Sequence, residues 1–566
     1  MRGLLALTNV QIESALNDGD LIAPPSTYAL LIALRAMKRP LLVITASSKA
    51  AEELTNELLE LHSDTLEFPA WETLPHERLS PSSDTVAKRI STLHALKDRK
   101  RNWIVVAPIR AMIHKINSQI VDTEPIYLER GKEFDLTHLQ EELVHFAYKR
   151  TDLVEKRGEF AVRGGILDIF PPDQDHPIRI DFFGDEIEEI SFFAVADQRT
   201  TQTISLPIKV LPCRELMITN EIRDVARDCS KKIESELLNK VADGLQPEGM
   251  ESLIPLLVDN LKLLSDFLPK NFEAIFIEKE RVIGRITDLL VTNDEFREAA
   301  WSSAAIGGKT PIELGRMDQT YVDWDELISN LDDYRDFRQF GGPEDQFIDL
   351  QPIEALRNNG DKLIGLLSDA LSAKKKIIFS LSSRGMIDRY ASILRDANLP
   401  VELQFPLNSA PTSGYIALTA STYRSGFSNE EFLFLTERDA TGNQSGMAER
   451  LPSKRRKNID PLTLRSGDYV VHEQYGIGRY LEMTQRSVGG VIREYLVIEY
   501  APAKRGQPGD RIFVPTDALD LVSKYIGGET PTVHRIGGGD WIKSKSRARK
   551  AVREIAGELI RLYAAR

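Results

Sequence analysis

Short apolar runs, rich in β-branched residues and separated by amphipathic stretches, constrain the fold of this chain more than any other feature. Residues 40–45 and 103–107 are two such runs, and residues 49–62 between them have helical periodicity. A strand that is apolar on both sides is typical of a parallel sheet covered by helices on both faces. The pattern therefore predicts an α/β domain in the first third of the chain. A further apolar run at residues 273–277 predicts that this domain resumes later.

The pattern changes between residues 155 and 193, where short strand-like segments alternate with turn residues. This change predicts a mostly antiparallel module inserted into the first domain. Short strands with glycine turns between residues 468 and 523 are typical of a small β-barrel. A second α/β unit is expected before that barrel. Its strands are residues 376–380, 414–419 and 431–436, and its helix is residues 384–398.

The length of 566 residues exceeds what one hydrophobic core supports, so several domains are expected. The chain has no uninterrupted apolar run of the roughly 18 residues that would span a membrane, so we expect a cytoplasmic protein without a membrane partner. Its two cysteines, Cys213 and Cys229, form no Cys-x-x-Cys pair and have no histidine cluster nearby. Neither a disulfide framework nor a metal site is predicted.

The net charge of −13 hides an asymmetry along the chain. Residues 451–566 hold 21 basic and 13 acidic side chains, a net charge of +8, which leaves −21 for residues 1–450. Phosphate neutralisation needs concentrated Lys and Arg, so the acidic bulk is not expected to bind nucleic acid. The basic end suits either nucleic acid or an acidic partner.

The most informative block covers residues 158–187, which have the pattern of consecutive strands. Side chains of a strand alternate between its faces, so the even-numbered residues of 178–182 form an inward set. Arg179 and Phe183 point the other way, and by the same alternation Arg163 joins their outer face. An aromatic residue beside an arginine is typical of an interface anchor. The open alternative is that Phe183 is covered by a neighbouring domain.

This block, with residues 68–75 and 80–84, resembles the UvrB-like module of the bacterial transcription-repair coupling factors (Mfd). The resemblance implies that the small inserted domain binds UvrA, the damage-recognition ATPase of nucleotide excision repair. It assigns this contact to Arg163, Arg179 and Phe183.

The same resemblance implies a helicase-like fold whose nucleotide motifs are degenerate. The expected phosphate loop falls at residues 23–28, where Ser26 and Thr27 stand without glycine or lysine, so no anion cradle is expected. Where an active relative would carry a magnesium-binding Asp-Glu pair, this chain has Glu278 and Lys279, and the lysine would repel the metal. We expect no ATPase activity and no cofactor in this chain, because ATP and magnesium belong to the translocase of the family.

No other feature of the sequence supports catalysis. Residues 308–310 (Gly-Lys-Thr) resemble the end of a phosphate loop, but Ser303 replaces its first glycine and Pro311 follows. No His-Glu-x-x-His or Gly-x-Ser-x-Gly pattern occurs, so no catalytic residue is predicted.

A second block, residues 467–480 continued by 511–515, resembles the RNA-polymerase-interacting domain that coupling factors share with CarD-type regulators. The resemblance implies a Tudor-like barrel that binds the β subunit of RNA polymerase, with Leu496 as the contact. Residues 493–500 carry apolar side chains on both faces, which suits a strand that extends the edge of a partner's sheet. The open alternative is that Leu496 belongs to the barrel core.

Residues 541–562 carry an apolar stripe close to the 3.6-residue period, with Asp540 as a candidate N-cap and no stop signal afterwards. This predicts a helix, which in the family leads into an ATP-driven translocase. It also predicts that the chain is a truncated piece of a longer protein.

Pattern and resemblance together predict a multidomain α/β fold. It comprises a degenerate helicase-like α/β module with an inserted mostly β domain, a second α/β domain, a small Tudor-like β-barrel and a C-terminal helix. The expected boundaries are 1–120 and 209–320 for the two parts of the helicase-like module, 121–208 for the inserted UvrA-binding domain, 321–351 for a linker, 352–440 for the second α/β domain, 441–463 for a flexible linker, 464–527 for the barrel and 528–566 for the helix.

The predicted function is that of a monomeric adaptor that binds RNA polymerase and recruits UvrA to transcribed DNA. DNA is expected to be bound mainly through the translocase that this chain does not reach. One rival is an active UvrB-like DNA helicase, which both degenerate nucleotide motifs disfavour. The other rival is a CarD-like regulator of RNA polymerase, in which the front domains are incidental.

Overall fold

The computed structural model describes residues 1–7, 12, 16, 19–73, 80–291, 320–341, 347–356, 359–441, 464, 466–472, 476–488, 491–502, 509–515, 522–525 and 531–535. The chain forms two compact units, Met1–Ala448 and Glu449–Arg566. Three predictions fall outside the described residues. They are the phosphate-loop-like residues 308–310, nearly all of the linker at 441–463, and the helix after Asp540.

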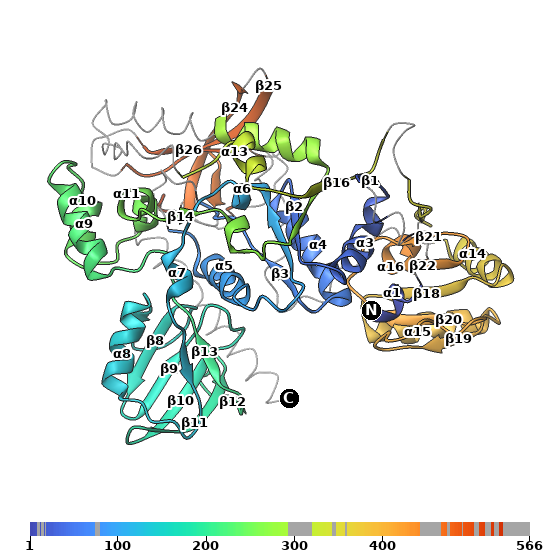
Figure 1. The fold of residues 1–566 in the computed structure, drawn as a ribbon, viewed down its shortest axis with the longest axis horizontal. Helices are drawn as coiled ribbons and strands as arrows, with labels where there is room; N and C mark the ends of the chain where they lie inside the picture. Colours follow the sequence, from blue (N-terminus) through green and yellow to red (C-terminus); the bar gives the residue numbers. More distant parts are fainter. Residues whose placement is uncertain are drawn as a thin grey trace. The chain divides into compact units, whose positions relative to one another are not determined.

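The first sheet consists of parallel strands, as the apolar runs predict (Figure 1). In spatial order they are β1 (Leu21–Ile22), β16 (Tyr334–Arg338), β15 (Glu273–Ile277), β2 (Leu41–Thr45), β4 (Ile104–Pro108) and β3 (Thr65–Glu67). Every residue of β2 and β4 is buried. Helices α3 (Tyr28–Ala36) and α4 (Ser48–Leu61) share a core with one face of this sheet, and α5 (Ser83–Ala95) shares a core with the other.

The helices begin where side-chain oxygens accept backbone hydrogen bonds. Ser47 accepts a bond from the N–H of Ala50 ahead of α4, and Ser82 accepts one from Thr85 ahead of α5. Such caps satisfy N–H groups that have no partner inside the helix. The boundaries of both helices therefore follow from local sequence.

The chain leaves the first sheet after β4 and returns to it at β15, and a second sheet lies between (Figure 1). Its order is β12 (Thr200–Thr203), β11 (Glu186–Phe193), β10 (Ile178–Phe183), β9 (Ile166–Ile169), β8 (Glu159–Arg163) and β7 (Lys149–Arg150). Its neighbours are antiparallel apart from β7 and β8. Helix α8 (Leu136–His145) covers the inner face, where its Leu139 and Leu143 share a core with Phe160 and Ile180.

Short elements join the first two sheets. Their bounds are α6 (Ile109–Met112), β5 (Ile116–Asn117), α7 (Gln119–Asp122), β6 (Ile126–Leu128), β13 (Ile208–Val210) and β14 (Leu261–Lys262). Helices α9 (Asn220–Ser230), α10 (Glu236–Ala242) and α11 (Ile254–Leu257) form an apolar cluster of their own.

Residues 321–351 are expected to form a linker, but the first half of this segment contains a helix and a strand of the first sheet. Helix α13 (Trp324–Ser329) leads into β16, which lies between β1 and β15 in the first sheet. The strand carries Arg335 and Asp336 in its middle, so its sequence lacks an apolar run. Both side chains find partners inside the fold, which lets polar residues occupy a central strand.

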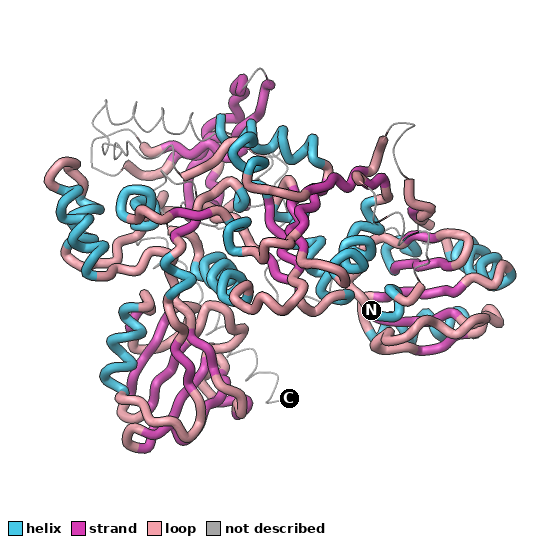
Figure 2. Tube along the Cα trace, in the orientation of Figure 1, coloured by secondary structure: helices cyan, strands magenta, loops and turns pink. Residues whose placement is uncertain are grey.

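A third sheet follows, as predicted for the second α/β unit. Its order is β17 (Gln351–Pro352), β21 (Phe427–Ser428), β22 (Phe432–Thr436), β18 (Lys376–Leu381), β20 (Ile416–Ala420) and β19 (Val401–Leu403). Helices α14 (Gly360–Ser372) and α15 (Arg384–Asp396) share a core with one face of this sheet. The other face shares a core with α1 (Arg2–Leu5) and α3. Figure 2 shows the strands and helices of this region.

The second unit contains an antiparallel sheet. Its order is β26 (Arg511–Pro515), β25 (Val491–Glu499), β24 (Gly476–Val488), β23 (Tyr469–His472) and β27 (Val522–Lys524). Its core includes Val470, Leu496, Ile498 and Val514. Closure of this sheet into a Tudor-like barrel stays a prediction.

The described part of the chain holds neither a membrane-spanning helix nor a metal-binding cluster. None of its helices is both long enough and apolar enough to cross a membrane. No group of three or more His, Cys, Asp or Glu side chains there is arranged to hold a metal ion.

Candidate functional site

The outer face of the second sheet brings together the residues that sequence analysis singled out. Along β10 the side chains alternate as predicted, with Ile178, Ile180 and Phe182 buried and Phe183 exposed. The pairing of β8 to β11 places two cross-strand rows on the outer face. One row is Arg163, Ile166, Asp181 and Glu189, and the next is Ala161, Asp168, Arg179 and Ser191. Arg163 and Arg179 therefore share a face, as predicted.

Phe183 is the most exposed large apolar side chain among the described residues, with 80% of its surface accessible. It ends β10, immediately before the turn at Gly184, whose φ of +65° suits glycine. The strand pairing shifts between Asp181 and Phe182, which marks a β-bulge. The extra residue, Glu188, belongs to β11, so the alternation along β10 continues and Phe183 points to the outer face. The alternative that a neighbouring domain covers Phe183 does not hold within the described residues.

Arg179 has a different environment from Phe183. Its Nε and Nη2 donate to the two carboxylate oxygens of Asp168 at 2.7 and 2.8 Å, and its Nη1 donates to the Gln198 carbonyl at 3.1 Å. The guanidinium also lies over the Phe193 ring at 4.9 Å. Only 18% of the Arg179 side chain is exposed, and 2% of Asp168. Its hydrogen bonds to Asp168 raise the pKa of Arg179, so the guanidinium keeps its charge.

A loop, residues 151–157, covers one half of the outer face and is called the strap below. Val154 of the strap is fully buried in a small cluster with Ala161, Phe170 and Phe193. Gln198 Nε2 donates to the Val154 carbonyl at 3.3 Å, and Arg163 donates to the carbonyl of Asp152. The strap is therefore fixed by both apolar packing and hydrogen bonds.

The face thus divides into two halves of different accessibility. The closed half is Ala161, Asp168, Arg179, Ser191 and Phe193, and the open half is Arg163, Ile166, Asp181, Phe183 and Glu189. Burial raises the pKa of Asp181; the charge of Arg179 opposes this rise and Glu189 adds to it. The open half therefore combines an aromatic ring, one arginine and a pair of acidic side chains.

Sequence analysis missed Asp168 and Gln198. A signal for Asp168 exists, because an acidic residue inside the apolar segment 166–169 needs a buried partner. No such signal exists for Gln198, which reaches the strap only through the turn after β11 and has a positive φ of 62°.

The degenerate nucleotide motifs lie at one edge of the first sheet, where its parallel strands end. The backbone N–H groups of Ala23, Thr27 and Tyr28 donate to the carbonyls of Arg338, Pro24 and Pro25. Pro24 and Pro25 have no N–H to offer. The Thr27 hydroxyl also donates to the Pro24 carbonyl at 2.7 Å, and Ser26 is half-buried. The Ser26 hydroxyl has no hydrogen-bond partner among the described residues, but the loop lacks the glycines and the lysine that cradle a phosphate, so these residues do not fit a nucleotide phosphate.

Glu278 and Lys279 lie beside this loop. The Tyr28 hydroxyl donates to Glu278 Oε1 at 3.2 Å, and the Gln339 N–H donates to the same oxygen at 2.9 Å. Burial raises the pKa of Tyr28 far above its usual range, and Glu278 adds to the rise, so the hydroxyl keeps its proton. The Lys279 ammonium lies over the Tyr334 ring at 4.6 Å. Both motif residues are therefore engaged by neighbouring side chains rather than directed to a metal.

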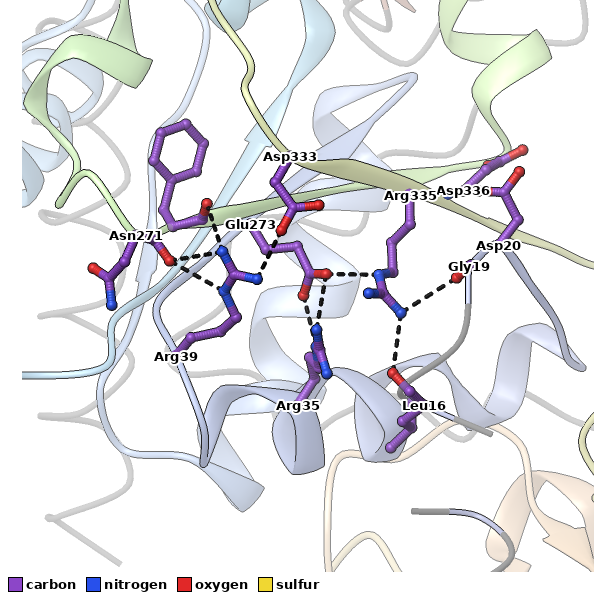
Figure 3. A network of polar contacts seen from close by, with 11 residues as sticks. Leu16, Gly19, Asp20, Arg35, Arg39, Asn271, Glu273, Asp333, Arg335 and Asp336 are labelled. Atoms are coloured by element: carbon purple, nitrogen blue, oxygen red, sulfur yellow. Dashed lines mark hydrogen bonds and ion pairs between the residues drawn. The ribbon is translucent and has the colours of Figure 1, made fainter. Parts of the chain in front are cut away.

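The opposite edge of the first sheet holds a buried charge network (Figure 3). Arg35 and Arg335 converge on Glu273, which is fully buried, with closest distances of 2.7 Å each. Arg335 also donates to the carbonyls of Leu16 and Gly19 at 3.0 and 3.2 Å. The network connects β15, β16 and α3 with the carbonyls of Leu16 and Gly19. Both oxygens of the Glu273 carboxylate are paired with arginine, so neither is left for a ligand.

The structure corrects the prediction for Leu496. Its side chain is 0% exposed and lies in the core of the C-terminal sheet with Ile498 and Val514. Residues 495–499 are paired with β24 on one side and β26 on the other, so this part of β25 is not an edge. The alternative that Leu496 is a core residue is the one that the geometry supports. Sequence alternation missed this because both faces of the strand are apolar.

Two regions of the chain match models of known domain families. Residues 126–216 match the model of the UvrB interaction domain. Residues 464–526 match the model of the CarD-like/TRCF RID domain. The first match contains the outer face described above, and the second contains the C-terminal sheet.

The chain as a whole is similar to transcription-repair-coupling factors. It is 37% identical to that of Mycobacterium tuberculosis (strain CDC 1551 / Oshkosh) over 96% of its own length and 47% of the relative's. It is 26% identical to that of Escherichia coli (strain K12), with 93% of this chain and 47% of the relative covered, and 24% identical to that of Bacillus subtilis (strain 168), with the same coverage. The chain thus spans about half the length of the curated relatives it matches. These findings confirm the resemblance to the N-terminal portion of the coupling factors.

Proposed function

We propose that this chain is an adaptor that binds UvrA through the outer face of its second sheet and RNA polymerase through its C-terminal sheet. The observation that carries the proposal is an open sheet face, with Phe183 and Arg163 exposed on it, inside the segment that matches the UvrB interaction domain. Exposed aromatic and arginine side chains are the residues that most often anchor interfaces. Joining two binding modules on one chain raises the effective concentration of one partner near the other.

The UvrA contact is tested by Phe183→Ala in the full chain, with binding to purified UvrA measured by calorimetry. We expect the affinity to fall about thirtyfold, as for a central aromatic anchor worth about 2 kcal/mol. Tyr127→Ala is a matched control, because Tyr127 is 55% exposed in the same matched segment but lies on β6. Equal UvrA affinity of the Phe183→Ala variant and the unmodified chain would contradict the proposal.

The polymerase contact is proposed for the end of the β24–β25 hairpin, with the β subunit as partner. Among the described residues, β26 pairs with β25 only from Tyr495 to Glu499, so the segment 491–494 has β24 as its one neighbour. A strand with one unpaired edge can add to a partner's sheet through its main-chain groups. This edge replaces Leu496 as the proposed contact.

A shortened hairpin tests this contact. Residues 485–494 are replaced by Asn-Gly, which joins the paired residues Thr484 and Tyr495 through a two-residue turn. We expect polymerase binding to be lost and UvrA binding to be retained. Retained polymerase binding would refute the edge contact. A chain that binds polymerase but never UvrA would instead favour the CarD-like regulator.

We also propose that this chain binds no nucleotide, and that DNA translocation belongs to the part of the relatives that it does not cover. The loop at residues 23–28, which contains neither glycine nor lysine, and the Glu278–Tyr28 hydrogen bond support this. The test is binding of a fluorescent ATP analogue with magnesium present. Saturable binding that Thr27→Ala abolishes would revive the UvrB-like helicase.

A further inference from the structure

We propose that Arg179 and Asp168 are positioning residues of the outer face, and that UvrA is received by the open half alone. In this assignment, Arg179 holds the strap and the turn after β11 in place and does not touch the partner. The inference rests on the proposed function of this face and deepens it, because it separates residues that contact the partner from one that acts through them.

The first argument is the state of the Arg179 guanidinium. Its two terminal nitrogens and Nε all donate to groups of the same domain, two bonds to Asp168 and one to Gln198. The Phe193 ring lies beneath it. Both oxygens of the buried Asp168 carboxylate accept from Arg179, so a partner that drew Arg179 away would remove the counter-charge of a buried carboxylate. The free energy gained from a direct contact between Arg179 and the partner would therefore be largely offset by the cost of leaving Asp168 without its counter-charge.

The second argument is the chain of contacts from Arg179 to the open half. The Gln198 carbonyl accepts from Arg179, and its side-chain amide donates to the carbonyls of Val154 and Val195 at 3.3 and 3.1 Å. Val154 lies in the strap, and Arg163 donates to the strap at Asp152. The position of the strap thus depends on Arg179 at one end and helps to set the position of the Arg163 guanidinium at the other. Loss of the pair is expected to weaken UvrA binding through Arg163.

The decisive variant is Asp168→Asn, because the two roles of Arg179 predict opposite results. If Arg179 contacts UvrA directly, the substitution frees its guanidinium and binding stays equal or improves. If Arg179 is a positioning residue, Asp168→Asn and Arg179→Ala each weaken binding about tenfold, and the double variant is no weaker than either single one, since both break the same pair. Additive losses, or a loss for Arg179→Ala alone, would overturn the proposal.

A second variant guards against a simple failure of folding. Gln198→Gly keeps the carbonyl that Arg179 uses and suits the positive φ at this position, but it removes the two side-chain bonds that reach the strap and the turn. We expect faster amide hydrogen exchange in residues 151–157, unchanged exchange in β9 and β10, and UvrA binding weakened about threefold. Unchanged exchange in the strap would overturn the proposed link.

The two proposals fail separately. If the unmodified chain does not bind UvrA, the proposed function fails, yet hydrogen exchange of the strap in the Asp168→Asn variant still tests whether the pair positions it. The proposed function stands if the unmodified chain binds UvrA and the Phe183→Ala variant does not. The positioning role is nevertheless wrong if the Asp168→Asn variant shows fast hydrogen exchange in the strap and still binds UvrA with unchanged affinity.

Discussion

The first and second sheets both contain a buried arginine–carboxylate cluster, but they differ in what surrounds it. In the first sheet, Glu273 takes two arginines, one from α3 and one, Arg335, that also donates to the carbonyls of Leu16 and Gly19 (Figure 3). In the second sheet, Asp168 takes one arginine beneath a strap that covers only half of a face. The arginine–carboxylate cluster of the first sheet is therefore buried, whereas the cluster of the second sheet lies next to exposed side chains, Phe183 and Arg163. The residues bordering such a cluster, rather than the cluster itself, therefore mark the proposed binding site.

The largest effect is expected for Glu273→Gln in the first sheet. The substitution leaves two buried guanidinium groups without a counter-charge, which costs about 3–5 kcal/mol of unfolding free energy. Chemical denaturation of the full chain measures it. The matched control is Glu67→Gln, whose partner Lys88 is largely exposed, with an expected cost below about 1 kcal/mol. Similar losses in both variants would show that the cluster does not hold this sheet.

Leu496→Ala extends the comparison to the C-terminal sheet. Because Leu496 is fully buried, removing its side chain leaves a cavity and is expected to cost about 3 kcal/mol of stability in that unit. Leu403→Ala, at a half-exposed leucine, is the control and should change stability by no more than about 0.5 kcal/mol. Thermal unfolding of the two variants is compared. A stable Leu496→Ala variant with lost polymerase binding would restore this residue as a direct contact.

The pH dependence of the first sheet is expected to include Asp336. Burial raises its pKa to about 6, and the charge of Asp20 adds to the rise, whereas the Lys279 N–H that it accepts opposes it. A carboxyl whose pKa is raised in the folded state stabilises the fold below its unfolded pKa of about 4 and loses that contribution as pH rises to about 6. Stability relative to Asp336→Asn should therefore fall by about 2 kcal/mol across this window. A flat difference between the two chains, measured by denaturation from pH 4 to 7, would contradict the assignment.

The smallest effect is expected for Arg163→Ala on the open half of the second sheet. Arg163 is exposed and donates to the Asp152 carbonyl, so stability should change by less than about 0.5 kcal/mol. UvrA affinity should fall about tenfold, which is about 1.4 kcal/mol. Arg199→Ala is the control, because Arg199 is 85% exposed on the same domain but lies in the turn after β11. If both variants lost the same UvrA affinity, the loss would reflect the removal of a positive charge rather than a specific contact of the open half.

Much of the secondary structure follows from the sequence pattern. The apolar runs at residues 40–45, 103–107 and 273–277 became β2, β4 and β15, because a strand buried on both faces needs apolar side chains throughout. β16 escaped prediction, because its Arg335 and Asp336 are satisfied by residues far away in the sequence. Periodicity cannot detect a polar residue whose partner is supplied by tertiary structure.

In the candidate site, too, sequence periodicity predicted which residues share a face, but it did not predict which of them are buried. Alternation along β10 correctly placed Phe183 and Arg179 on one face, which needs only the period of a strand. It could not tell that Arg179 is covered and Phe183 exposed, since the covering strap and Gln198 belong to other segments. It also could not rank the two faces of β25, because both are apolar and only the arrangement of β24 and β26 buries Leu496.

The sequence by itself determined which segments are strands and helices, which residues share a face, and which family the chain resembles. These are properties of local periodicity and of ordered motifs. Tertiary structure alone decided which polar side chains are consumed inside the fold and which remain for a partner. The physical reason is that burial and hydrogen bonding of a charged group depend on atoms brought together from distant parts of the chain.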